Sequence, residues 1–333
     1  MLAVVCPGQG SQTPGMLGPW LELPGVPELV AAASEAADTD LAAHGTTSDA
    51  DTIRDTAVAQ PLIVASSLLA LRVILDGRDT AGVVDVTAGH SVGEVAAAAV
   101  AGVVSDDGAA GLVAARARAM AKAAAARPSG MSAVVGGQPE EVLAAIEAAG
   151  LWPANVNSAA QVVAAGALEN LAKLADNPPP GARVIPLQVA GAFHTPFMDA
   201  AREEFTPVAT GFAGKDPVLP FLADLDGAAY TGGAHGHGTA SDVLANLAGQ
   251  VTAPVRWDLV SDSLAARGVT ALLELAPGGV LTGLAKRALK GVETVAVKSP
   301  GDIDAARDLI SRHSAAGGAA GTESAGTTPG APQ

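Results

Sequence analysis

The sequence contains few aromatic residues and few basic ones. Phe, Trp and Tyr make up 3% of its 333 residues, so the core must consist mainly of Ala, Val and Leu, and little material remains for a surface that stacks nucleic-acid bases. The 19 Lys and Arg residues stand against 34 Asp and Glu. The resulting net charge of −15 repels phosphodiester backbones and anionic lipid headgroups. These shortages argue against a protein that binds nucleic acid.

Cysteine and long apolar runs are also scarce. The single cysteine, Cys6, excludes an internal disulfide and a cysteine-based zinc site, and it is typical of a reducing compartment. We expect no stretch of the roughly 18 apolar residues that a membrane helix needs. The apolar run Leu2–Cys6 is too short for a signal peptide and lacks a basic leader. We therefore expect a cytoplasmic protein that contacts no membrane, with Cys6 as a small core residue.

Hydrophobic residues are abundant, at 49% of the chain, which is enough for a large core. A strand over Leu2–Cys6 is followed by a loop with two glycines at 7–12. A β-branched run at 83–87 precedes a glycine-flanked turn and an Ala-rich helix. This order predicts an α/β fold with a parallel, hydrolase-like sheet. The helices that we expect around it span 27–43, 61–75, 94–99, 106–126, 198–209, 242–250 and 281–289, and a further strand spans 271–275.

Residues 131–189 differ in the pattern of their predicted elements, because short strands and helices alternate there in the order βαββαβ. This order is typical of a ferredoxin-like subdomain. We therefore expect a discontinuous larger domain, 1–128 and 191–313, with the small subdomain at 129–190 inserted into it. Residues 314–333 are mainly Ala, Gly, Ser, Thr and Pro and predict a disordered tail. The expected elements of the subdomain span 131–135, 139–149, 151–156, 161–165, 168–175 and 183–189.

Ser91 lies in the sequence Gly-His-Ser-Val-Gly at 89–93. Glycines on both sides allow a tight turn from strand to helix that exposes the serine hydroxyl above the sheet. The following helix directs its amide end at the same point, where the N–H of Val92 can stabilise the oxyanion formed by attack on a carbonyl. The spacing and its place favour a nucleophilic serine over an ordinary helix N-cap.

A serine nucleophile needs a base, and the sequence has six histidines. His194 is the best candidate, because it lies where the small subdomain returns to the larger domain, and clefts form at such junctions. His90 adjoins Ser91 and is interpreted as structural support. His235 and His237 indicate a metal only weakly, since no cluster of carboxylates or cysteines accompanies them. We predict no metal site.

Arg116 and Met120 lie one turn apart on the same face of the helix expected at 106–126. Arg118 points roughly the other way. A buried guanidinium would suit a substrate carboxylate because its planar fork matches the two oxygens. An arginine in an Ala-rich helix is more often a surface charge, so spacing alone leaves both interpretations open.

Seven motifs, in order over residues 2–298, resemble those of the malonyl-CoA:acyl carrier protein transacylases. Seven motifs in register are far more specific than any one of them. The segment before the histidine, Ala192-Phe193-His194, is similar to the malonyl-selective members of the wider acyltransferase group. The motifs are Pro7–Gln12, Gly89–Glu94, Arg116-x-x-x-Met120, Gln161–Val163, Gly191–His194, Pro254–Trp257 and Gly278–Leu284.

This resemblance implies an acyltransferase that moves malonyl from coenzyme A to the phosphopantetheine thiol of acyl carrier protein through a malonyl-serine intermediate. It further implies an enzyme of fatty-acid synthesis, or alternatively of polyketide synthesis, without a bound cofactor. We expect the chain to be a monomer. The implied roles are Ser91 as nucleophile, His194 as base, Gln9 and Val92 as oxyanion-hole amides, Arg116 with Met120 and Phe193 as the malonyl-binding residues, and the carbonyl of Gln250 as the group that orients the histidine.

The chain departs from the family at three positions, of which only Gly279 bears on partner binding, because it removes a possible cation from the carrier-protein side. Val92 and Val95 stand where leucine and an aromatic residue are common, and Gly279 stands where a lysine is common. Acyl carrier proteins are usually acidic, so an enzyme of charge −15 repels them at long range. Docking then needs a local basic patch, and the candidates are Lys286, Arg287 and Lys290.

Two other functions remain open at this level. A serine hydrolase of the α/β-hydrolase or patatin type shares the turn around Ser91 but releases its acyl group to water. The loop at Gln9, the missing catalytic acid and the candidate carboxylate clamp argue against it. A non-catalytic module that binds a carrier protein is the second alternative, and the presence of both Ser91 and His194 argues against that one.

Overall fold

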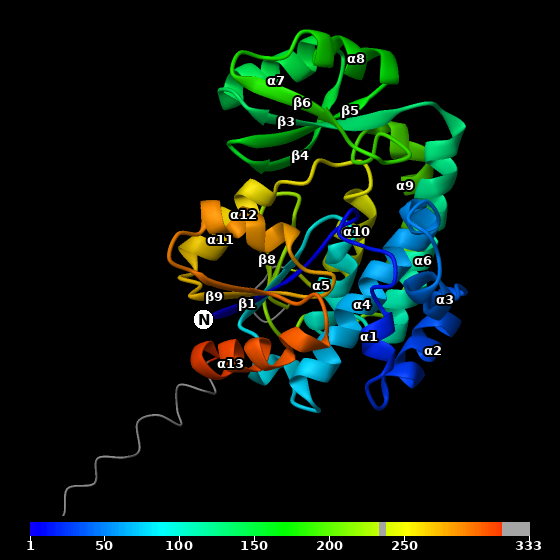
Figure 1. Ribbon diagram of the computed structural model, residues 1–333, viewed down its shortest axis with the longest axis vertical. Helices are drawn as coiled ribbons and strands as arrows, with labels where there is room; N and C mark the ends of the chain where they lie inside the picture. Colours follow the sequence, from blue (N-terminus) through cyan, green and yellow to red (C-terminus); the bar gives the residue numbers. More distant parts are fainter. Residues whose placement is uncertain (233–237, 315–333) are drawn as a thin grey trace, which may run out of the picture.

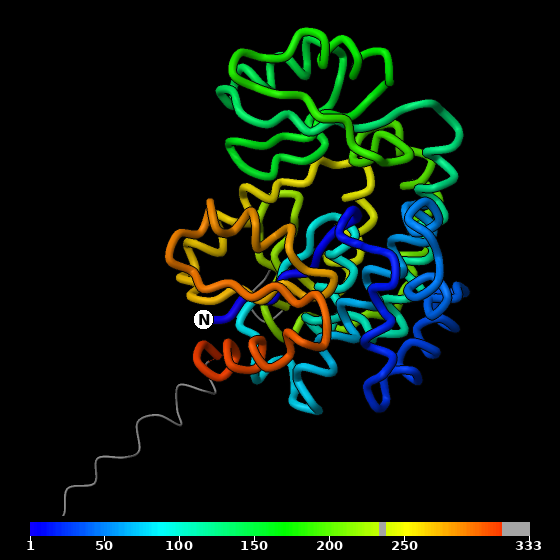
Figure 2. Tube along the Cα trace, viewed as in Figure 1, coloured from blue at the N-terminus to red at the C-terminus, as the bar shows by residue number. Residues whose placement is uncertain are grey.

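The computed structural model describes residues 1–232 and 238–314, which form two units stacked one above the other (Figure 1, Figure 2). The larger unit contains a six-stranded sheet and the smaller unit a four-stranded one. Apart from Ser314, the tail expected at 314–333 lies outside the described residues. The chain is thus an α/β protein with a mainly parallel sheet and a separate antiparallel sheet.

The larger sheet is built around β1 (Leu2–Cys6), which runs parallel to β2 (Val86–Gly89) on one side and to β9 (Ala271–Glu274) on the other. Every residue of β1 is buried, as expected for a strand covered on both faces. The strand order is β10-β9-β1-β2-β7-β8, and β8 alone is antiparallel to its neighbour. The other strands are β7 (Phe221–Leu222), β8 (Ala229–Tyr230) and β10 (Glu293–Ala296).

Helices cover both faces of this sheet (Figure 1). Their bounds are α1 (Gly18–Leu21), α2 (Val26–Ala37), α3 (Leu41–Thr46), α4 (Thr56–Leu75), α5 (Gly93–Val100), α6 (Asp106–Ala126), α9 (Asp199–Thr210), α10 (Ala240–Gly249), α11 (Trp257–Ala266), α12 (Val280–Ala288) and α13 (Ile303–His313).

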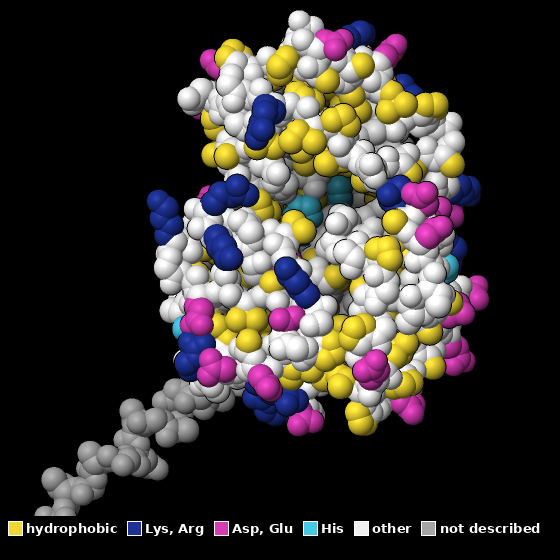
Figure 3. All heavy atoms as spheres, viewed as in Figure 1, with side chains coloured by type: hydrophobic (Ala, Val, Ile, Leu, Met, Phe, Trp, Pro, Cys, Tyr) yellow, Lys and Arg dark blue, Asp and Glu magenta, His cyan; other side chains and the backbone are white. Residues whose placement is uncertain are grey.

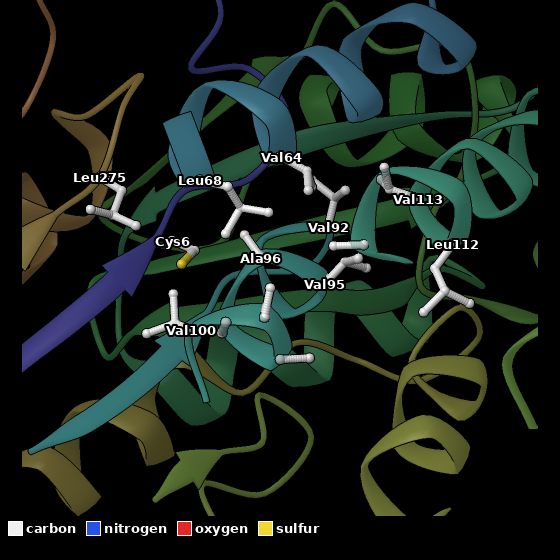
Figure 4. Close-up of a cluster of buried hydrophobic side chains, with 14 of the residues drawn as sticks. Cys6, Val64, Leu68, Val92, Val95, Ala96, Val100, Leu112, Val113 and Leu275 are labelled. Carbon is white, nitrogen blue, oxygen red and sulfur yellow. The ribbon is translucent and has the colours of Figure 1, made fainter. Parts of the chain in front are cut away.

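Alternate residues of β1 point into two separate cores. Leu2, Val4 and Cys6 pack with α4, α5 and α6, whereas Ala3 and Val5 pack with α11 and α12. Figure 4 shows short aliphatic side chains around Cys6, as the shortage of aromatic residues predicts. The prediction that Cys6 is a core residue is confirmed, since it is fully buried and unpaired.

The smaller unit has the element order that the sequence predicts. Its strands pair as β4-β5-β3-β6, all antiparallel, and α7 and α8 supply side chains to a hydrophobic core of their own. The last strand ends at Pro186 rather than at the predicted 189. The elements are β3 (Gly130–Gly136), α7 (Pro139–Ala148), β4 (Trp152–Ser158), β5 (Gln161–Gly166), α8 (Leu168–Asp176) and β6 (Ala182–Pro186).

The prediction of one helix over 27–43 was wrong. The segment forms α2 and α3, separated where Asp38 adopts a left-handed backbone conformation with φ +51°. Asp40 then starts α3, because its side chain accepts a hydrogen bond from the N–H of Ala43.

The expectation that no stretch reaches the length of a membrane helix was also wrong. Among residues 1–232 and 238–314, one helix, α4, is long and apolar enough by length and composition. It begins at Thr56, five residues before the predicted start, because Asp55 caps it through the N–H of Ala57. The most apolar 18-residue window of α4 is 78% buried inside the fold. Its hydrophobicity is therefore that of a central core helix.

Candidate active site

Ser91 lies at the tip of a sharp turn between β2 and α5. Its φ of +55° is a left-handed conformation that costs a non-glycine residue of the order of 1–3 kcal/mol. A Cβ on Gly89 would overlap the backbone of Gly93 and Glu94, and a Cβ on Gly93 would overlap the carbonyl of Cys6. The two glycines thus let the turn close against β1.

Replacing Gly93 with Ala should therefore displace the turn and slow acylation of Ser91 by more than about 100-fold. The added methyl forces α5 away from β1, and we expect a loss of about 1–3 kcal/mol in the free energy of unfolding. The matched control is Gly283→Ala on α12, because a Cβ there meets no atom within 4 Å. Rates of coenzyme A release and thermal melts of both variants test the idea, and an unchanged rate in Gly93→Ala would contradict it.

The structure brings His194 to Ser91 across 103 residues of sequence: Oγ of Ser91 lies 2.7 Å from Nε2 of His194. Nδ1 of His194 lies 3.0 Å from the carbonyl oxygen of Gln250 and 3.1 Å from that of Ala253. A carbonyl can only accept, so Nδ1 carries the proton and Nε2 is the acceptor for the Ser91 hydroxyl. Two main-chain carbonyls thus stand where a triad would have an acid.

His194 is held in its basic form. The side chain is buried, and burial together with the charge of Arg116 lowers the pKa of His194 to about 3. The imidazole is therefore neutral at any pH near 7 and free to accept a proton. Like Ser91, His194 has a left-handed backbone, with φ +59°, so both partners of this contact sit at strained positions.

Arg116 is buried beside the nucleophile. Its guanidinium donates to Oε1 of Gln60 at 2.7 Å and to Oε1 of Gln250 at 2.6 Å, and Nη2 lies 3.4 Å from Oγ of Ser91. Burial lowers the pKa of Arg116 to about 10, so it keeps its charge near pH 7. The next arginine on the helix, Arg118, is exposed and donates to the carbonyl of Ala37. The structure therefore directs Arg116, and not Arg118, to the site.

A cavity of about 90 Å³ lies above Ser91 between the two units, and Figure 3 shows histidine side chains at the bottom of the hollow that leads to it. Within the described part of the chain, the main-chain N–H groups of Gln9 and Val92 donate no hydrogen bond. Both are thus available to an oxyanion. The residues that line the cavity are Gln9, Gln60, His90, Ser91, Met120, Met131, Asn155, Val163, Leu187, Val189, Phe193 and His194.

His90 connects the two units. Its Nε2 lies 2.9 Å from Oδ1 of Asn157 on β4, and its ring packs 5.5 Å from that of Trp257 on α11. Burial lowers the pKa of His90, so the ring is neutral. These contacts agree with its interpretation as structural support, although it also lines the cavity.

A second layer of polar residues below Ser91 was not predicted from the sequence. Gln60 precedes the expected start of its helix, and the sequence predicts for Glu94 only a place at the start of the helix expected at 94–99. Asp224 follows β7, which has two residues and is too short for a periodic signal. Asn246 lies on α10 and donates to Glu94.

The remaining candidates lie away from this layer. Lys286, Arg287 and Lys290 are exposed at the end of α12 and just after it. His235 and His237 fall outside the described residues. Within residues 1–232 and 238–314, no group of three His, Cys, Asp or Glu is placed to hold a metal ion.

Comparison with known proteins assigns the class first. A family model described as the acyl transferase domain matches residues 3–303, so the chain belongs to the acyltransferases. The malonyl CoA-acyl carrier protein transacylase of Mycobacterium tuberculosis is 51% identical over 314 residues, which cover 93% of this chain and 100% of that protein. The chain therefore belongs to the malonyl CoA-acyl carrier protein transacylase family.

Solved structures agree with this assignment. A crystal structure of MCAT from Mycobacterium tuberculosis has a TM-score of 0.85 at 50% identity, over 92% of this chain and 99% of that one. A malonyl-transacylase in complex with a type II PKS acyl-carrier protein has a TM-score of 0.85 at 30% identity, again over 92% and 99%.

Proposed function

We propose that this chain transfers the malonyl group from malonyl-CoA to the phosphopantetheine thiol of an acyl carrier protein by a two-step exchange through Ser91. The observation that carries the proposal is the contact between Ser91, His194 and the buried Arg116. A nucleophile, its base and a cation meet within 3.4 Å of one hydroxyl oxygen. This is the chemistry required for an acyl group that ends in a carboxylate.

In the first step, the hydroxyl proton of Ser91 passes to Nε2 of His194 while Oγ bonds to the thioester carbonyl carbon. The N–H groups of Gln9 and Val92 hold the resulting oxyanion. The carbon–sulfur bond then breaks, the proton on His194 goes to the departing sulfur, and a malonyl ester remains on Ser91.

In the second step, the thiol of the carrier protein gives its proton to Nε2 of His194 and attacks the ester carbonyl. The same two N–H groups hold the second oxyanion. When the carbon–oxygen bond breaks, the proton returns to Oγ of Ser91 and the malonyl thioester leaves. No cofactor is required, because each proton is held by His194 between the two partners.

Arg116 supports selectivity for malonyl. Its charge lies beside the attacking oxygen, so the carboxylate of a malonyl group can pair with it while its thioester carbon faces Ser91. Met120 and Phe193 line the same cavity and present apolar surface to the acyl chain; the Sδ of Met120 accepts a hydrogen bond from Nε2 of Gln60.

Intact-protein mass spectrometry with a panel of acyl-CoA donors tests the proposal. The protein should gain one malonyl group from malonyl-CoA and lose it when a phosphopantetheinylated carrier protein is added. Loss of the label in buffer alone, at a rate unaffected by carrier protein, would instead indicate a hydrolase.

The proposal extends to organisation and cellular role. We infer a hydrolase-like domain, 1–128 and 191–313, and a ferredoxin-like subdomain at 129–190; the parallel order around β1 and the βαββαβ order of the smaller unit support this division. We further infer a cytoplasmic monomer in fatty-acid synthesis. Polyketide synthesis is the alternative role. It is supported by the similarity to a malonyl-transacylase solved in complex with a type II PKS acyl-carrier protein.

Docking of the acidic carrier protein is proposed at the basic patch of Lys286, Arg287 and Lys290. Figure 3 shows Lys and Arg side chains gathered over α11 and α12, beside the hollow between the units. Gly279 itself supplies no cation, but a lysine lies next to it. Nζ of Lys298 is 3.7 Å from the position that a Cβ on Gly279 would occupy.

Reversing the charge of Lys286 and Arg287 together, as Lys286→Glu with Arg287→Glu, should slow transfer to the carrier protein by about tenfold at low salt, because rim charges act mainly on the association rate. Release of coenzyme A from malonyl-CoA should keep its rate. Lys173→Glu on α8 is the matched control. Equal losses in both half-reactions would contradict a docking role.

A further inference from the structure

Two carboxyl groups lie buried directly beneath the nucleophile. Asp224 and Glu94 have no exposed surface, and Arg116, with 1% exposed, is the cation beside them. Oδ2 of Asp224 accepts a hydrogen bond of 2.7 Å from the N–H of Ser91. The amide of Gln250 links the group, because its Nε2 lies within 3.1 Å of Oδ2 of Asp224 and Oε2 of Glu94 while its Oε1 accepts from Arg116.

The hydrogen bonds distinguish the two carboxyl groups. Both oxygens of Glu94 accept from N–H donors: Oε1 from the main chain of Asp224, and Oε2 from Asn246 and Gln250. Oδ1 of Asp224 is the only oxygen of the four without a partner within the described part of the chain. An ionised oxygen buried without a donor is costly. A proton on Oδ1 of Asp224 removes that cost, whereas a proton on Glu94 would oppose its donors.

From this arrangement, and resting on the proposed function, we propose that Asp224 is a positioning residue that acts in its protonated form. Its Oδ2 fixes the main chain of Ser91, and its proton on Oδ1 leaves Glu94 as the single negative charge that balances Arg116. Arg116 then keeps its attraction for the malonyl carboxylate, because it faces one buried anion and not two.

The charges around the pair favour one bound proton near neutrality. Burial raises the pKa of both carboxyl groups, that of Asp224 to about 7, and repulsion by Asp224 adds to the rise at Glu94. The donors from Asp224 and Gln250 and the charge of Arg116 act on Glu94 in the opposite direction and favour its ionised form. The other titratable groups nearby are Arg116, His194, His90 and Tyr230. The pKa of His194 is lowered to about 3 and that of Arg116 is about 10, so neither changes charge between pH 6 and 8.5. Burial lowers the pKa of His90 and raises that of Tyr230, in both cases away from the range in which Asp224 titrates.

Ionisation of Asp224 should weaken the binding of malonyl-CoA. As the pH rises through the pKa of Asp224, a second negative charge appears beside Glu94 and competes with the malonyl carboxylate for Arg116. The KM for malonyl-CoA in the acylation step should then rise about five- to tenfold between about pH 6 and 8.5, as for a like charge added in a partly screened site. The KM for acetyl-CoA should not change, because acetyl carries no carboxylate.

The test compares Asp224→Asn, an isostere of protonated aspartic acid, with Asp224→Ala. Labelling of Ser91 by phenylmethylsulfonyl fluoride, which needs neither Arg116 nor malonyl-CoA, should slow about 30-fold in Asp224→Ala, as loss of a buried hydrogen bond predicts. It should stay within about threefold of wild type in Asp224→Asn. Glu204→Gln on the surface is the control for a lost carboxylate, and thermal melts show whether Asp224→Ala is folded.

The pH profile gives a second, independent measurement on variants that fold. In Asp224→Asn the rise of the malonyl-CoA KM with pH should disappear. The proposal is overturned if that rise persists in Asp224→Asn, if wild type shows none, or if Asp224→Asn labels as slowly as Asp224→Ala. A wild-type protein that is labelled by the sulfonyl fluoride but accepts no malonyl-CoA would overturn the proposed function instead, and the comparison of labelling rates would still test Asp224.

Discussion

Replacing Ser91 with Ala should abolish covalent labelling of the protein by radioactive malonyl-CoA and reduce coenzyme A release by at least about 10⁴-fold, since loss of a nucleophile removes the whole covalent route. The hydroxyl is the only oxygen within hydrogen-bonding distance of Nε2 of His194 in the described part of the chain. Without it, the base has no proton to accept. Autoradiography of the denatured protein measures the label directly.

Ser311→Ala on the surface of α13 is the matched control for a lost hydroxyl, and it should label as wild type does. The Ser91→Ala protein should also fold normally, because an alanine keeps the N–H that Asp224 accepts. Label that persists on folded Ser91→Ala would place the nucleophile elsewhere in the chain.

Replacing Arg116 with Ala should slow acylation by malonyl-CoA by about 100-fold or more while acylation by acetyl-CoA changes by less than about fivefold, because a buried carboxylate that loses its charged partner costs several kcal/mol. The rate of malonyl-CoA acylation in Arg116→Lys should lie between those of wild type and Arg116→Ala, since lysine restores the charge without the planar fork. Stopped-flow measurement of coenzyme A release with both donors resolves the two effects.

The matched control is Arg118→Ala, which removes an arginine from the exposed face of the same helix and should leave both donors unaffected. Removing Arg116 also leaves Gln60 and Gln250 without their shared donor and Glu94 without the cation that balances its charge. The acetyl-CoA rate reports on that disturbance, so the ratio of the two rates isolates the carboxylate. Equal losses with both donors would contradict a role for Arg116 in malonyl selection.

The sequence predicts the parts of the site that depend on local geometry. The turn at Ser91 needs glycines at two positions, and both glycines and the flanking strand and helix are visible in the sequence. The base could be inferred from its place at a domain junction. The sequence shows that only one of Arg116 and Arg118 can face the site, because helical spacing makes the two side chains diverge. It does not show which of the two is buried.

The polar residues beneath Ser91 cannot be predicted from the sequence in this way. Asp224 is surrounded in the sequence by residues typical of a loop, and its approach to Ser91 depends on the pairing of β2 with the two-residue strand β7. Gln60 lies in the apolar helix α4, and Gln250 directly follows the last residue of α10. Neither segment gives a local reason to bury a polar side chain. Their burial is a property of the packing of α4, α6 and α10 together, which no single segment specifies.

The site also determines when activity can arise during synthesis. Gly93 packs against the carbonyl of Cys6, the N–H of Ser91 requires Asp224, and His194 is oriented by carbonyls as late as Ala253. A nascent chain on the ribosome therefore carries Ser91 long before it carries a working nucleophile. Acylation begins only when the chain has emerged beyond Ala253 and folded, so shorter nascent chains neither consume malonyl-CoA nor become trapped as acylated intermediates.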